Sequence, residues 1–158
     1  MADQTATLTS SYVNVLSAQQ RAATGYTHSF RIPYTEVYSA SQTTQGDTKT
    51  ITLGTTPARY AVDHVLVDIT TAYATTGTLT VSVGTSSNTA LLLAAVTAKT
   101  AGVNTAAAGA VPANKTEGTS AATLQVRFTT QSSTGAISDI TAGDLYVYLR
   151  IIDLTSVR

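Results

Sequence analysis

The chain has 158 residues, with nine basic and nine acidic side chains, no cysteine and no tryptophan. Charged residues make up 11% of the chain and the formal net charge is zero, whereas a typical globular domain has roughly 25% charged residues. The lack of cysteine excludes disulfides, thiolate zinc sites and thiol nucleophiles. The balanced, sparse charge argues against nucleic-acid binding through a broad basic surface.

The length suits one domain with a core of its own. The most apolar stretch, Ala90–Ala95, is far shorter than the roughly 20 residues of a membrane-spanning helix. The first residues lack the basic and apolar regions of a secretory signal. We therefore expect synthesis in the cytoplasm without export by that route, and no association with a membrane.

Residues 1–20 differ from the rest of the chain because they are polar, nearly uncharged and free of glycine and proline. This composition fits either a disordered tail or an extended arm that becomes ordered against a neighbouring subunit. A short apolar alternation predicts an edge strand near the end of this arm. The side chains expected to dock there are Tyr12, Val13, Val15 and Leu16.

Threonine makes up about a fifth of the chain, and its branched side chain favours strands. Six runs alternate apolar and polar residues, which predicts half-buried strands: Tyr26–Ile32, Thr48–Leu53, Ala61–Thr70, Thr78–Val83, Leu124–Phe128 and Leu145–Ile151. In the first run, Tyr26 is expected to share a face with Phe30. The predicted core consists of apolar members of the other runs: Ile51, Leu53, Val65, Val67, Ile69, Leu79, Val81, Val83, Leu124, Val126, Phe128, Leu145, Val147, Leu149 and Ile151.

Helical signals are almost missing. Asn88–Val96, with its three consecutive leucines, is predicted to be a short helix, and Thr97–Ser120 a long loop with a weak strand near Thr100–Thr105. The pattern as a whole predicts an all-β fold: a single-domain β-sandwich or jelly roll of about eight strands at residues 21–158, preceded by the extended arm.

Chemistry-bearing residues are few. His28 and His64 are expected to be ordinary strand residues, and no serine lies in a nucleophile motif. Asp139 and Asp144 flank a turn, where carboxylates usually accept bonds from nearby backbone. No nucleotide-binding motif occurs. We therefore predict no catalytic residue, no cofactor and no metal ion, and a protein that is not an enzyme.

Tyr146 and Tyr148 are two residues apart in the last predicted strand, so both are expected on its outward face. Paired tyrosines on a sheet can stack against sugars or cover an interface with another protein. Without tryptophan to accompany them, the interface is the favoured interpretation.

Five segments together resemble small virion structural proteins of tailed bacteriophages, in particular the capsid decoration (cement) proteins: Val65–Tyr73, Gly77–Thr85, Ala90–Ala95, Thr100–Val103 and Ile140–Leu149. The resemblance covers roughly residues 60–150 and is one of pattern. It implies a non-enzymatic component on the capsid surface of the virion. The implied partners are the major capsid protein and copies of the chain itself, often as a homotrimer. The alternative is a carbohydrate- or receptor-binding β-module of a tail fibre or spike.

Overall fold

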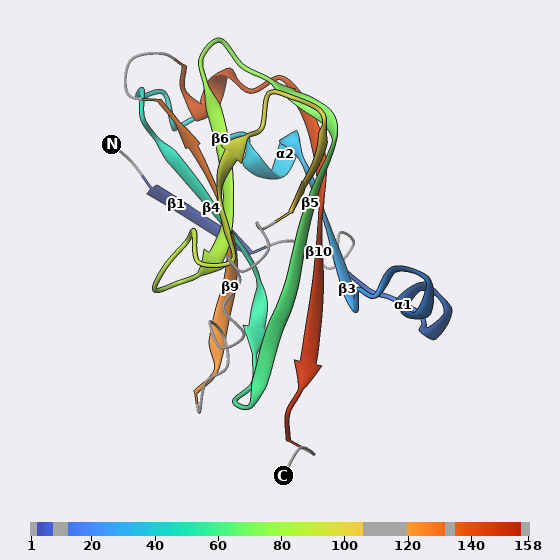
Figure 1. Ribbon diagram of the computed structural model, residues 1–158. Helices are drawn as coiled ribbons and strands as arrows, with labels where there is room; N and C mark the ends of the chain where they lie inside the picture. Colours follow the sequence, from blue (N-terminus) through green and yellow to red (C-terminus); the bar gives the residue numbers. More distant parts are fainter. Residues whose placement is uncertain (1–2, 8–12, 106–119, 132–134, 156–158) are drawn as a thin grey trace.

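The fold is an all-β sandwich, as the sequence predicts. The computed structural model describes residues 3–7, 13–105, 120–131 and 135–155, which form two facing five-stranded sheets (Figure 1). Sheet A has the order β1-β4-β9-β6-β7 and sheet B the order β2-β3-β10-β5-β8. The strands are β1 (Asp3–Thr7), β2 (Val13–Val15), β3 (His28–Pro33), β4 (Thr48–Thr56), β5 (Tyr60–Ala74), β6 (Leu79–Thr85), β7 (Leu93–Thr97), β8 (Gly102–Thr105), β9 (Ala122–Thr130) and β10 (Ala142–Asp153).

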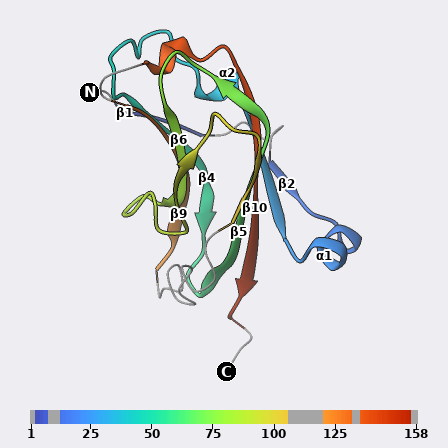
Figure 2. The same ribbon diagram turned by 45° about the horizontal axis from the view of Figure 1, so that its top comes forward.

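The paired strands run antiparallel, except that β1 lies parallel to β4. Both sheets are open, with β1 and β7 at the edges of sheet A and β2 and β8 at the edges of sheet B. Three short helices complete the described part: α1 (Ala18–Thr24), α2 (Tyr34–Val37) and the 3-10 helix η2 (Ile137–Asp139). α1 lies beyond β3 at the side of the sandwich (Figures 1 and 2), and none of its residues is buried.

The core lies between the sheets and follows the predicted alternation. Every predicted core residue is buried except Ile151, which is partly buried and packs against the core. The core also includes side chains outside the predicted core set, among them Phe30, Ile32, Tyr73, Leu92 and Ile137. Burial of two apolar sheet faces against each other supplies the main stabilising free energy of such a fold.

The predicted helix at Asn88–Val96 is wrong. The chain makes a tight turn in which the Thr85 and Asn88 backbones exchange hydrogen bonds of 2.9 and 3.1 Å, and it then enters β7. Gly84 permits this turn, because a Cβ there would lie 2.1 Å from the Asn88 carbonyl oxygen. Leu92 and Leu93 are buried by the return of the chain onto β6, and this tertiary contact is not visible in a local apolar run.

The weak strand expected near Thr100–Thr105 is β8, and the rest of the predicted loop, residues 106–119, lies outside the described residues. At the other end of the chain, β2 confirms the edge strand at positions 13–15, while Tyr12 lies outside the described residues. The arm boundary expected at residue 20 falls inside α1. In this single chain, β1 pairs with β4 and β2 pairs with β3.

The helix α1, which was not predicted, has clear end signals in the sequence. The Ser17 hydroxyl accepts from the Gln20 N–H at 3.2 Å, and the Gln20 side chain accepts from the Ser17 N–H at 2.9 Å. Gly25 ends the helix with a left-handed φ of 76°. This capping box followed by glycine defines even a two-turn helix.

Candidate interaction surface

Tyr146 and Tyr148 lie side by side on the outer face of sheet B, as their spacing predicts. Their neighbours Leu145, Val147 and Leu149 are fully buried on the opposite face of β10. The two tyrosine rings stack with centroids 6.1 Å apart and planes inclined by 19°. Since β10 is the central strand of its sheet, it holds the two rings on a rigid base.

A third tyrosine joins this pair from a remote part of the sequence. The Tyr26 ring lies 5.8 Å from the Tyr148 ring and 6.1 Å from the His64 ring, measured between centroids. The expectation that Tyr26 shares a face with Phe30 is therefore wrong: β3 begins only at His28, and the left-handed turn at Gly25 directs Tyr26 to the exterior. We call Tyr26, His64, Tyr146 and Tyr148 the tyrosine face.

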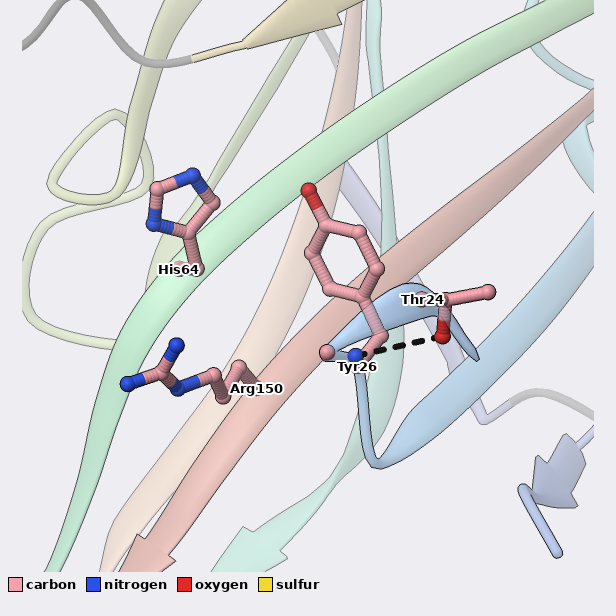
Figure 3. A pocket seen from close by; sticks show the side chains of 5 residues that line it. Thr24, Tyr26, His64 and Arg150 are labelled. Atoms are coloured by element: carbon pink, nitrogen blue, oxygen red, sulfur yellow. Dashed lines mark hydrogen bonds between the residues drawn. The ribbon is translucent and has the colours of Figure 1, made fainter. Parts of the chain in front are cut away.

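Beside the tyrosine face is a hollow of about 170 Å³ lined by Thr24, Gly25, Tyr26, His64 and Arg150. Figure 3 shows His64 on β5, Arg150 on β10, Thr24 at the end of α1 and Tyr26 on the turn that follows it. The Thr24 hydroxyl accepts a 3.3 Å hydrogen bond from the Tyr26 N–H, which fixes this turn.

Two ion pairs flank the tyrosine face. Arg31 on β3 binds Asp144 on β10 at 2.7 Å, and Arg150 binds Asp63 at 2.9 Å. Arg31 donates to the carboxylate through both Nε and Nη2, a geometry that fixes both side chains. The centre of the surface is thus aromatic and its border is charged, which is the arrangement found at protein interfaces.

Two phenol groups of this surface are neutral over the physiological range. Burial raises the pKa of Tyr26. Burial, and then the nearby Asp68 and Tyr146, raise the pKa of Tyr148. Both hydroxyls therefore stay protonated and can donate hydrogen bonds.

Val13 and Val15, which were predicted as interface residues of the N-terminal arm, lie on the other face of sheet B. Val13 and Val15 pair with Phe30 and His28, whose side chains face the space between the sheets. The structure therefore does not bring these valines together with Tyr146 and Tyr148. Leu16 is only 6% exposed, so its own chain already covers it.

Val13 and Val15 border an apolar groove at the open side of the sandwich. The groove has a volume of about 240 Å³ and carries no charged side chain: it is lined by Val13, Val15, His28, Phe30, Leu53, Gly54, Thr55, Thr56, Leu124 and Ile151. Burial, and then the nearby Arg21 charge, lower the pKa of His28, which keeps its imidazole neutral at pH 7.

The residues with catalytic or metal-binding chemistry are dispersed or engaged by the protein. Asp139 accepts hydrogen bonds from the Ala136 N–H at 3.0 Å and the Thr76 hydroxyl at 2.8 Å. His64 is exposed on β5. Within the described ranges, no three His, Asp or Glu side chains gather as a metal site, and no helix has the length and apolarity to cross a membrane.

Comparisons with known proteins place the chain in no family. No family model matches it, and no curated protein matches it. Among solved structures, it is similar to a chain from the capsid of Ralstonia phage GP4, with a TM-score of 0.41 and 19% sequence identity over 77% of this chain and 84% of that chain. A likeness at this level does not define a function.

Proposed function

We propose that the protein is a non-enzymatic structural component of a tailed-phage virion, a decoration or cement protein that binds the capsid lattice through its tyrosine face. The observation that carries the proposal is the group of three adjacent tyrosines on the outer side of a rigid sheet, two stacked and the third tilted against them, bordered by ion pairs. Tyrosine and arginine dominate the binding free energy of protein interfaces when they lie at the centre of a contact. The pattern resemblance to decoration proteins supplies the choice of partner, the major capsid protein.

The sparse charge of the chain supports the same role. A shell protein must pack in many copies at close range, and self-repulsion rises with net charge. Here the formal net charge is zero, and the two ion pairs next to the tyrosine face are satisfied within one chain. Copies can therefore lie close together on a capsid without electrostatic penalty.

Replacement of both tyrosines, Tyr146→Ser with Tyr148→Ser, is expected to weaken binding to capsids assembled without this protein by about 100-fold or more. Each interface tyrosine at the centre of a contact typically contributes about 2 kcal/mol, and the two together exceed a 100-fold change in Kd. Co-sedimentation of the purified protein with such capsids, over a range of protein concentrations, measures the change.

Tyr38→Ser is the matched control, because Tyr38 is 43% exposed but lies after α2, outside the tyrosine face. The control is expected to bind like the wild type, and all variants are expected to keep the wild-type circular dichroism spectrum. Equal binding by the double variant and the wild type would refute the tyrosine face as the capsid contact.

The second candidate function is a carbohydrate- or receptor-binding module of a tail fibre or spike. It is favoured by the hollow beside Tyr26, where the His64 and Arg150 side chains could bond sugar hydroxyls next to an aromatic ring. Binding of the isolated protein to a glycan array, lost in a Tyr26→Ser variant, would select this function. Many copies per virion favour the decoration protein, and a few copies favour the fibre or spike.

A further inference from the structure

We propose that β2 is a self-association strand: two copies of the chain pair antiparallel through β2 about a two-fold axis, which joins their B sheets and covers the exposed Val15 of each copy. The inference concerns contacts between copies of the chain and does not depend on what the tyrosine face binds.

The first observation is an unprotected sheet edge. In the part of the chain that the structure describes, β2 is the last strand of sheet B on its side. Charged side chains and proline usually prevent edge strands from pairing with another chain. The sequence of β2, Val13-Asn14-Val15, contains neither. The backbone hydrogen bonds that join β2 to β3 continue beyond the end of β2, because the Leu16 N–H donates to the Thr27 carbonyl at 2.9 Å. The free edge of β2 is therefore held in an extended shape that suits pairing.

The second observation is that Val15, an apolar residue, is exposed on the face of sheet B that is directed toward sheet A. It is 63% exposed, yet it pairs with His28 on the side of sheet B that faces the apolar groove. On sheet A, β1 accompanies β4 only as far as Thr52, whereas β4 runs on to Thr56. Among the residues that the structure describes, no strand therefore covers this part of β4 beside Val15, and an apolar side chain placed there would be removed from water.

A second β2 strand is the occupant that fits this opening best. In an antiparallel pair, opposite residues project to the same face of the sheet. A two-fold axis at Asn14 would therefore place each Val15 beside the other copy's Val13, over the groove. The groove has no charged lining residue, and β2 supplies only uncharged side chains. One contact thus covers the same exposed valine in both copies, as an isologous interface requires.

The opposite edge of the same sheet is a poorer partner for β2. In β8, Gly102 pairs with Ile69 and Asn104 pairs with Val67, so these two residues face the inside of the sandwich. They would offer Val15 no apolar side chain. The exposed Val103 of β8 pairs with Asp68 and lies on the outer face, so it cannot meet Val15 across a β2–β8 pair.

A short strand buries little area, so the pairing is expected to be weak in solution and stronger where copies are held side by side. In sedimentation equilibrium, the wild-type mass is expected to rise from 16.3 kDa toward twice that value between ~10 and ~500 µM. Val15→Lys is expected to stay monomeric over this range, because a lysine would have to be buried at the edge.

Val103→Lys is the matched control, since Val103 is 61% exposed on the other edge of sheet B. It is expected to dimerise like the wild type, and neither variant is expected to change the melting temperature of the monomer. Dimerisation lost equally in both variants would point to a head-to-tail β2–β8 contact and would overturn the proposal. A wild-type chain that remains monomeric at ~500 µM would also overturn it.

A crosslink tests the predicted register directly. Opposite residues of an antiparallel pair have Cα atoms about 4.5–5.5 Å apart, within disulfide range, and the chain has no cysteine of its own. Asn14→Cys is therefore expected to give a covalent dimer under mild oxidation, whereas Val103→Cys is expected to remain monomeric. Absence of the Asn14→Cys dimer under conditions where the wild type dimerises would refute the two-fold axis at Asn14.

Discussion

Replacement of Tyr73 by alanine is expected to lower the free energy of unfolding by about 3–5 kcal/mol, the usual cost of removing a buried aromatic ring. Tyr73 is 1% exposed and belongs to β5 of sheet B, while its ring packs at 5.3 Å against Phe128 of β9 in sheet A. Its hydroxyl donates to the Ile32 carbonyl at 2.5 Å. The ring therefore joins the two sheets, and its hydroxyl ties β5 to β3.

Thermal melting followed by circular dichroism measures this effect. For a domain of this size, 3–5 kcal/mol corresponds to a fall of about 6–20 °C in the melting temperature. Tyr73→Phe keeps the ring and loses only the hydrogen bond, so it is expected to cost about 1 kcal/mol. A similar fall for Tyr73→Phe and Tyr73→Ala would show that the hydroxyl, and not the packing between the sheets, makes the contribution.

Alternation with a period of two was sufficient to predict the strands that have one face on the core. Leu79, Val81 and Val83 are fully buried as predicted, because each side chain of β6 on that face meets the opposite sheet. Ile151 also keeps the inward orientation, but it is only partly buried. It packs against the core at the margin of the sandwich, where it lines the apolar groove beside Val13 and Val15.

The sequence pattern did not predict the contacts between segments that are distant in sequence. The strand β7 is short, and only Leu93 of its five residues is buried, so no alternation marks it. Tyr73 is buried although it follows the predicted end of its strand at Thr70, because the chain at Ala98 and the start of β10 at Gly143 both lie against it. These contacts join residues far apart in sequence.

The tyrosine face was predictable only in part, because one of its tyrosines reaches it through tertiary structure. The spacing of Tyr146 and Tyr148 within one strand places them together, and the structure agrees. Tyr26 is more than 100 positions away from them and reaches the face only because a glycine reverses the chain after α1. The capping signals of α1 were present in the sequence, but nothing in them specifies where the residue after the turn will lie.

Gly143→Ala is expected to be the second severe substitution, lowering the free energy of unfolding by about 2–4 kcal/mol through overpacking and backbone strain. A Cβ at position 143 would lie 2.4 Å from two atoms of the Tyr73 ring. The ring cannot move aside easily, since it is enclosed between the sheets and held by its hydroxyl. Gly143 also has a φ of 141°, a conformation that residues with a side chain rarely adopt.

Combining Gly143→Ala with Tyr73→Ala separates the two causes. If the clash with the ring dominates, the cavity left by Tyr73→Ala accepts the new methyl group, and the double variant loses less free energy than the sum of the two single losses, by about 1–2 kcal/mol. If backbone strain at the positive φ dominates, the two losses add. Gly102→Ala is the matched control, because Gly102 has a φ of 148° and a Cβ added there would meet nothing within 4 Å. Its loss of unfolding free energy is therefore the cost of backbone strain alone. Chemical denaturation of all four variants alongside the wild type measures these losses. A Gly143→Ala variant no less stable than Gly102→Ala would show that the close approach of the backbone to Tyr73 is not required for the fold.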